Sequence, residues 1–218
     1  MGVSSPSCGG AAWTQSGSTN IFIGIRLSVG STTATTVQGN TIANVSHTTS
    51  STSTTHAGIS LTTGNFSVLN NTIGSTSVAG SISLTYTGIA SRFNGILFGT
   101  GTVPNINVES NIIDGITMNA TSVGFFHGIS YSGTGTPTFV IKNNTIGGTT
   151  SGISITTVPT SASLIAGIWG GSATSNQNVE GNTIQNIALS STYTGIQLYG
   201  IYQSNSGASV TKIIKNTV

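Results

Sequence analysis

The side chains able to catalyse a reaction are few, because only three of the 218 residues are acidic. Two carboxylates on opposite sides of a sugar can hydrolyse a glycosidic bond, one as an acid and the other as a base or nucleophile. Glu109 and Glu180 are the candidates for this catalytic pair, and Asp114 is the third carboxylate. Whether the two glutamates face each other depends on the elements that carry them.

A metal or cofactor site is not expected from the remaining polar residues. Calcium needs several oxygen ligands with more than one carboxylate among them, and zinc needs three or four converging ligands. The three histidines, His47, His56 and His127, stand in different sequence surroundings, and Cys8 is the single cysteine. No phosphate-binding glycine loop and no serine-nucleophile motif occurs.

Trp169 and Tyr202 are the residues best suited to bind carbohydrate, since an exposed aromatic ring offers a flat apolar surface to a sugar ring. Each lies two residues after the glycine of a repeated Gly-Ile phrase. We expect stacked repeats to place the two rings together on the outer surface. The alternative is that they cover neighbouring apolar atoms without binding a ligand.

The composition argues against nucleic acid and membrane as partners. Charged residues make up 4% of the chain, against about 25% in ordinary soluble domains, and the five basic residues form no cluster that could grip a phosphate backbone. No apolar run approaches the roughly 18 residues that a membrane helix needs. Single Ile and Val residues among Ser, Thr, Asn and Gly instead suit half-buried strands joined by polar turns.

Two short phrases recur six times and organise the chain. The first is Gly-Ile, at Gly24-Ile25, Gly58-Ile59, Gly95-Ile96, Gly128-Ile129, Gly167-Ile168 and Gly200-Ile201. The second reads V-x-x-N-x-I, with Val or Ile at either apolar place, and its asparagines are Asn40, Asn71, Asn111, Asn144, Asn182 and Asn216. A unit with one constant and one variable part, repeated every 33 to 39 residues, indicates a solenoid.

Apolar and polar residues alternate around each phrase, as expected of short strands. We therefore predict an all-β parallel solenoid of about six coils over residues 21–218, with coils about 4.8 Å apart and residues 1–20 as an N-terminal cover or linker. The two phrases resemble those of right-handed parallel β-helix proteins of the pectate-lyase-like superfamily. The resemblance implies a right-handed coil, which the general crossover rule also favours, but no single activity, because that fold carries many.

Stacking converts each repeated position into a column. The Ile after each glycine, and the apolar residues of the second phrase, should form interior aliphatic ladders. The six asparagines should form a structural ladder at a tight bend, because Asn tolerates left-handed backbone angles and its amide can bond to the amide of the next coil. The alternative, that these amides bind a ligand, fits a regular ladder less well.

The same stacking places Glu109, Lys142 and Glu180 in one column. The two glutamates would be two coils apart, roughly 9–10 Å, at or beyond the upper limit for an inverting carboxylate pair. With Lys142 between them, the column is typical of a surface ion-pair ladder, in which each pair stabilises by about 0–1 kcal/mol. We therefore expect no catalysis by Glu109 and Glu180.

The Thr- and Ser-rich segments, such as residues 47–56 and 190–199, are expected to be loops of unequal length. A flat array of threonines on successive coils would suit ice binding, so loops of unequal length argue against that function. Binding residues are frequent on loops, and a ligand site would lie on these variable segments.

These features favour a non-catalytic exported domain, a structural or adhesin-like surface module that binds glycans. Its expected partner is carbohydrate or another cell-surface polymer, and its expected location is extracellular or at the cell surface, although no signal peptide begins the chain. The alternatives are a polysaccharide lyase or glycoside hydrolase of the pectate-lyase-like type, and an assembly protein of a phage or filament. Because the chain stops inside the sixth phrase, we expect it to continue in a longer protein or to associate end to end.

Overall fold

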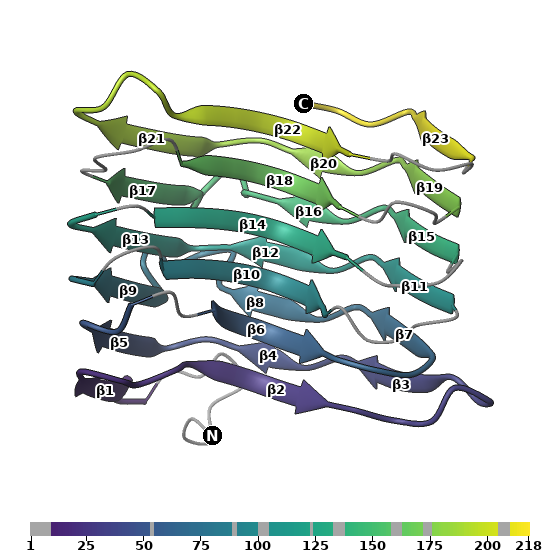
Figure 1. Cartoon of the computed structure of the whole chain (residues 1–218), viewed down its shortest axis with the longest axis horizontal. Coiled ribbons are helices and arrows are strands. Elements are labelled where there is room, and N and C mark those ends of the chain that lie inside the picture. The colour runs from purple at the N-terminus through teal and green to yellow at the C-terminus, as the bar shows by residue number, and fades with distance from the viewer. Residues whose placement is uncertain are drawn as a thin grey trace.

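The computed structural model of the chain is an all-β solenoid (Figure 1). It describes residues 10–52, 55–88, 91–99, 105–122, 124–132, 138–157, 163–171, 176–204 and 210–218. These residues form strands β1 to β23 and no helix. The chain passes through four parallel sheets in turn and makes five complete turns between β1 and β21. The predicted all-β parallel solenoid is therefore confirmed. Cys8 lies outside the described residues.

Four sheets form the walls of the solenoid. The β1/β21 sheet contains β1 (Trp13–Gly17), β5 (Val45–Thr49), β9 (Ile82–Tyr86), β13 (Ile116–Ala120), β17 (Ile153–Thr157) and β21 (Ile187–Ser191). The β2/β22 sheet contains β2 (Ile23–Leu27), β6 (Thr55–Leu61), β10 (Ser91–Phe98), β14 (Gly124–Tyr131), β18 (Leu164–Gly170) and β22 (Gln197–Gln203). The β3/β23 sheet contains β3 (Thr35–Gln38), β7 (Phe66–Leu69), β11 (Asn105–Glu109), β15 (Thr138–Lys142), β19 (Asn176–Glu180) and β23 (Thr211–Ile214). The β4/β20 sheet contains β4 (Thr41–Ile42), β8 (Thr72–Gly74), β12 (Ile112–Asp114), β16 (Thr145–Ile146) and β20 (Thr183–Ile184).

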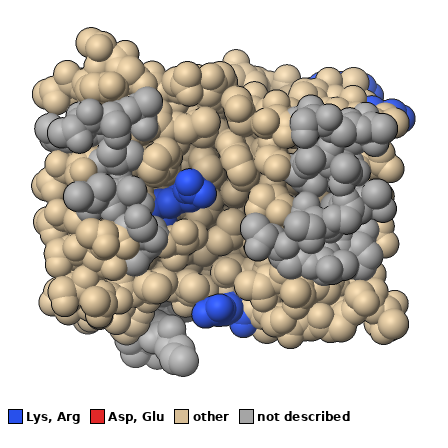
Figure 2. Space-filling model, in the orientation of Figure 1, with Lys and Arg blue, Asp and Glu red and all other residues tan. Residues whose placement is uncertain are grey.

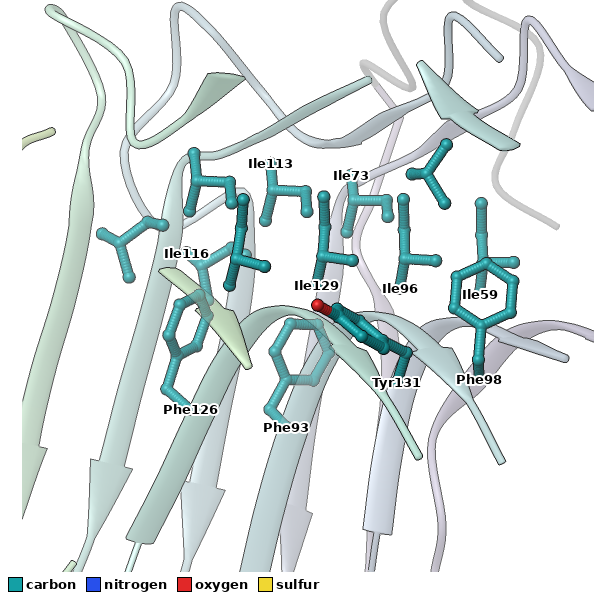
Figure 3. Close-up of a cluster of buried hydrophobic side chains, with 14 of the residues drawn as sticks. Ile59, Ile73, Phe93, Ile96, Phe98, Ile113, Ile116, Phe126, Ile129 and Tyr131 are labelled. Atoms are coloured by element: carbon teal, nitrogen blue, oxygen red, sulfur yellow. The ribbon is translucent and has the colours of Figure 1, made fainter. Parts of the chain in front are cut away.

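The aliphatic ladders predicted from the repeated phrases form the core. The strand register aligns Ile59, Ile96 and Ile129 across β6, β10 and β14, and all three are fully buried. Figure 3 shows this row facing a second row that contains Ile73 and Ile113. Burial of each aliphatic side chain stabilises the fold by roughly 1.5–3 kcal/mol, and the stiff χ1 rotamers of Ile suit a pleated stack.

The close approach of neighbouring backbone requires the glycine in the first five Gly-Ile phrases, and at Gly200 the close neighbour is the side chain of Val218. A Cβ atom on Gly58 would lie 2.8 Å from the carbonyl oxygen of Gly95 and 2.8 Å from Cγ2 of Ile73. Both distances are shorter than van der Waals contact, and the carbonyl belongs to backbone that cannot turn aside. Any larger residue would push this strand away from the next coil and from the facing ladder.

The asparagine ladder runs along the corner between the β3/β23 and β4/β20 sheets. In its centre, Nδ2 of Asn111 donates to Oδ1 of Asn144 at 2.9 Å and to the carbonyl oxygen of Val68 at 2.9 Å. Oδ1 of Asn111 accepts the backbone N–H of Asn71 at 3.0 Å. The same amide-to-amide bond joins every successive pair of the six asparagines.

The left-handed backbone conformation at this corner belongs to the residue before each asparagine, so the prediction that the asparagine itself adopts it is wrong. The φ angle is 53° at Asn70, 58° at Ser110 and 54° at Asn143. The preceding residue thus turns the chain, and the asparagine side chain bonds the two neighbouring coils. Gly fills the same turning position in two coils, which agrees with its tolerance of positive φ.

The Thr- and Ser-rich segments expected as loops are strands at their ends, where that expectation is wrong, whereas residues 50–52 and 192–196 lie outside the strands. In β5 and β9, the side chains of His47, Thr49 and Tyr86 point into the solenoid, where each is at most 1% exposed. The outward residues between them carry hydroxyl groups. Polar residues at the inward positions hide the apolar alternation that normally marks a strand.

Candidate functional site

Trp169 and Tyr202 lie on the outer face of the β2/β22 sheet, which we term the aromatic face. The register pairs Trp169 of β18 with Tyr202 of β22, and both side chains are half-buried. This sheet is turned toward the viewer in Figures 1 and 2. On the other coils this column contains Arg26, Ser60, Leu97 and Ser130, so it is not uniform.

Trp169 also covers part of the preceding coil. Its indole stacks on the ring of His127, with ring centroids 5.2 Å apart and planes 3° from parallel. The direct strand neighbour of Trp169 is Ser130, so the indole leans three residues back toward the start of β14. Beside this stack, the guanidinium carbon of Arg92 lies 5.1 Å from the centroid of the Phe125 ring, a cation–π contact.

Buried polar atoms without a hydrogen-bond partner among the described residues occur on members of these two ring contacts and on Asn94 beside them. They are Nε of Arg92, Oδ1 of Asn94, and Nδ1 and Nε2 of His127. The register places Asn94 directly beside His127, and Arg92 directly beside Phe125, on the neighbouring strands β10 and β14. Nearly all buried polar atoms in proteins have a partner, and an ordered water is small enough to serve atoms that are closed off in this way.

The aromatic face is positively charged, and its histidine is neutral. Burial, and to a smaller extent the charge of Arg92, lower the pKa of His127 to about 3. At neutral pH the imidazole therefore offers one N–H donor and one acceptor. Figure 2 shows basic side chains at two places over the centre and lower edge of this face and no acidic side chain on its described part.

Glu109 and Glu180 lie elsewhere, on the outer face of the β3/β23 sheet. The register aligns Glu109, Lys142 and Glu180 across β11, β15 and β19. Nζ of Lys142 lies 3.2 Å from Oε2 of Glu180, and this hydrogen bond is the main cause of the lowered pKa of Glu180. The two glutamates thus share a column with a lysine between them, but they do not face a sugar held at Trp169.

The histidines and Asp114 do not converge on a metal site. Within the described ranges, no three His, Cys, Asp or Glu side chains lie close enough to hold a metal ion. His47 and His56 pack inside the solenoid with ring centroids 5.0 Å apart, and His56 stacks on Tyr86 at 4.8 Å. Burial lowers the pKa of both, to about 4 at His56, where His47 adds a smaller electrostatic effect. Asp114 is buried and accepts the backbone N–H of Gly115 at 2.8 Å.

The sequence predicts Trp169 and Tyr202 as binding residues, but it does not predict the contribution of Arg92, Asn94 and His127 to this face. A signal for two of them exists, because Asn94 and His127 each directly precede the glycine of a Gly-Ile phrase. The other residues of that column are mostly small or apolar, and are Ile23, Ala57, Ala166 and Tyr199. A polar residue is unusual in this column because the column is largely buried, and that burial is known only from the structure.

Comparison of the chain with protein families, with curated proteins and with solved structures finds no match. The likeness to the pectate-lyase-like superfamily therefore depends on the repeated phrases and on the parallel solenoid. In the part of the chain that the structure describes, no helix is long and apolar enough to cross a membrane.

Proposed function

We propose that the chain is a non-catalytic carbohydrate-binding module and that the aromatic face is its binding surface. The observation that supports this most is the grouping of half-buried aromatic rings with the half-buried Arg92 on one outer face. The rings of Trp169 and Tyr202 suit the apolar side of a sugar, and the half-buried guanidinium of Arg92 offers hydrogen-bond donors beside them. Small-molecule sites generally combine apolar walls with a few placed polar groups in this way.

Arg92 determines the charge of the preferred ligand. Its guanidinium lies over Phe125 and pairs with no carboxylate among the described residues. A carboxylate on the ligand would therefore gain a charge-assisted hydrogen bond that no protein group already satisfies. We expect acidic oligosaccharides to bind more tightly than neutral ones of equal length, and we expect the difference to shrink at high salt.

An exported, adhesin-like role and membership of the pectate-lyase-like superfamily belong to the same proposal. They are supported by the low charge and the repeated phrases. The lyase or glycoside hydrolase alternative has less support, because Glu109 and Glu180 lie on a different sheet from the aromatic face. End-to-end association stays a prediction, for which the exposed side chains of Leu198, Ile213 and Val218 on the last coil are the relevant surface.

Isothermal titration calorimetry with acidic and neutral oligosaccharides, selected on a glycan array, tests the proposal. Trp169→Ala should weaken binding about tenfold, equivalent to about 1.4 kcal/mol, and Tyr202→Ala should weaken it less. Tyr193→Ala removes an exposed ring between β21 and β22 and should change nothing. The proposal is wrong if the wild-type chain binds no glycan, or if folded Trp169→Ala binds as tightly as the wild type.

A further inference from the structure

The outer face of the β1/β21 sheet carries two regular columns of hydroxyl groups, and we term it the hydroxyl face. The first column is Thr14, Ser46, Ser83, Thr117, Ser154 and Ala188. The second column is Ser16, Thr48, Thr85, Asn119, Thr156 and Ser190. Ten of the twelve positions are thus Ser or Thr, and all twelve are exposed or half-buried.

The strands of the hydroxyl face stay in register although the segments before them differ in length. Ser46 comes six positions after Asn40, whereas Ser83 comes twelve positions after Asn71. Ser46 and Ser83 are nevertheless direct strand neighbours. The extra residues lie in the turn before β9. The expectation that unequal loops prevent a regular array is therefore wrong, because the length variation is taken up outside the strands.

The array is a nearly rectangular lattice. Neighbouring strands lie about 4.8 Å apart, and alternate residues along a strand lie about 6.6 Å apart. Most sheets twist by roughly 20–25° per strand, but stacking and side-chain ladders can keep a sheet flat. Figure 1 shows β5, β9, β13, β17 and β21 stacked with little rotation. Threonine is stiff at χ1, so its hydroxyl and methyl groups hold their places in the lattice.

The chemistry of this face suits an uncharged, periodic occupant. Its six strands contain no Asp, Glu, Lys or Arg, so charge complementarity disfavours an ionic ligand. None of its outward residues is aromatic, so a sugar ring has no ring on which to stack. Apart from Thr14, which donates to the carbonyl oxygen of Ala12 at 3.3 Å, no array hydroxyl is bonded to another described residue, and each can bond water.

We propose that the hydroxyl face binds ice. Oxygen atoms recur in ice at spacings of similar size along two perpendicular directions, so water held by the Ser and Thr hydroxyls can join a growing crystal plane. The methyl groups of Thr restrict the orientations of the water between them. This binding is independent of carbohydrate binding, because the aromatic face belongs to a different sheet.

Thermal hysteresis and uptake of the full chain into a slowly growing ice hemisphere test the proposal. The wild type should be enriched in the ice and should shape ice crystals. Thr85→Tyr and Thr117→Tyr, on the central strands β9 and β13, place a bulky ring on the array and should remove most of the hysteresis. Tyr is well tolerated in strands, and Ser67→Tyr on the outer face of the β3/β23 sheet is the matched control that should behave as the wild type.

A second pair of variants tests the lattice by completing it. Asn119→Thr and Ala188→Thr fill the two irregular positions and should raise the hysteresis above the wild-type value. The proposal is overturned if the wild type is excluded from ice like a control protein of equal size. It is also overturned if Thr117→Tyr keeps full hysteresis at an unchanged melting temperature, or if the wild type binds microcrystalline cellulose through Thr117 and does not bind ice.

Discussion

The aromatic face and the hydroxyl face are outer surfaces of the same coils, yet residue types recur from coil to coil much more regularly on the hydroxyl face. On the hydroxyl face, ten of twelve outward positions are Ser or Thr. On the aromatic face, the column of Trp169 and Tyr202 also contains Arg26, Leu97 and Ser130. Both sheets bury a regular aliphatic ladder, Val45, Ile82, Ile116 and Ile153 beneath the hydroxyl face and Ile59, Ile96 and Ile129 beneath the aromatic face, so core packing does not account for the difference.

Outward residues are not selected by core packing, so a uniform outward column needs another cause. Strand propensity explains the threonines in part, but Ser is not among the strand-favouring residues. A uniform surface suits a ligand that is itself periodic, whereas a varied surface suits one discrete ligand at one place. The uniform hydroxyl face thus fits the proposed ice lattice, and the varied aromatic face fits the proposed saccharide.

The largest effect is expected when the scaffold that the two faces share is broken by Asn111→Leu. The side chain is fully buried and bonds both neighbouring coils, so its loss leaves several polar groups unsatisfied. At roughly 1–3 kcal/mol for each unsatisfied group, we expect the free energy of unfolding to fall by about 3 kcal/mol or more. Urea denaturation measures this change, and both binding activities should decline together.

Asn105→Leu is the control for the ladder, because Asn105 lies at the exposed start of the same strand, β11. Its free energy of unfolding should change by no more than about 0.5 kcal/mol. If Asn111→Leu were equally harmless, or if it impaired one face alone, the two faces would not share a scaffold.

An intermediate effect is expected from acid, because the buried histidines stay neutral in the folded state. The pKa is about 4 at His56 and about 3 at His127, whereas unfolded histidine titrates near pH 6.5. The unfolded chain therefore binds more protons in this interval, so stability is full above about pH 6.5 and is lost as the pH falls through the folded pKa values. Melting temperatures followed by circular dichroism should fall progressively below about pH 6.5.

His127→Phe sharpens the comparison, since a phenyl ring can lie beneath Trp169 but cannot be protonated. Between pH 6.5 and about 3, this variant should lose less stability than the wild type. Glycan binding should change little, because His127 is buried beneath Trp169 and the phenyl ring keeps that contact. Ice binding should not change, since the outward residues of the hydroxyl face do not titrate. An unchanged pH profile would show that His127 is not a source of the acid sensitivity.

The smallest effect is expected at the ion pair of Lys142 and Glu180, which belongs to neither face. Both side chains are partly exposed, and solvent screens such pairs. Lys142→Met should lower the melting temperature slightly at low salt and not measurably at high salt. Because Lys142 lowers the pKa of Glu180, this stabilisation is present above the ordinary carboxyl pKa and is lost as the pH falls through the lowered value. If Lys142→Met lowers the melting temperature much more than Lys212→Met does, the column of Glu109, Lys142 and Glu180 is part of the scaffold.

The scaffold was largely predictable, because a residue that recurs on every coil serves a position that every coil shares. The aliphatic ladders were predicted correctly for this reason, as was the stacking of the asparagine amides. The turn at the ladder was misplaced by one residue, because Asn70 and Ser110 adopt the left-handed conformation while the invariant asparagine does not. Repetition reveals which position is constrained, but it does not reveal which of two neighbours bends.

The candidate site was predictable only in part. Equal spacing from two glycines was enough to align Trp169 with Tyr202 on neighbouring coils. The contact between Trp169 and His127 was not predictable, because it depends on a side chain that leans three residues back across the next strand. The burial of Asn94 and His127 was equally hidden, since it depends on side chains of several coils.

The repeated phrases alone determine the coil, the stacking and the columns, because the close approach at glycine and the amide bonds at asparagine permit one register. Only the folded chain decides which wall a non-repeating residue belongs to and which way it faces. His47 and Thr49 point inward while Ser46 and Thr48 point outward. The physical reason is that alternation can be recognised only where inward residues are apolar. In this segment they are polar, and their inward direction emerges only from their alignment with buried residues of the next coils.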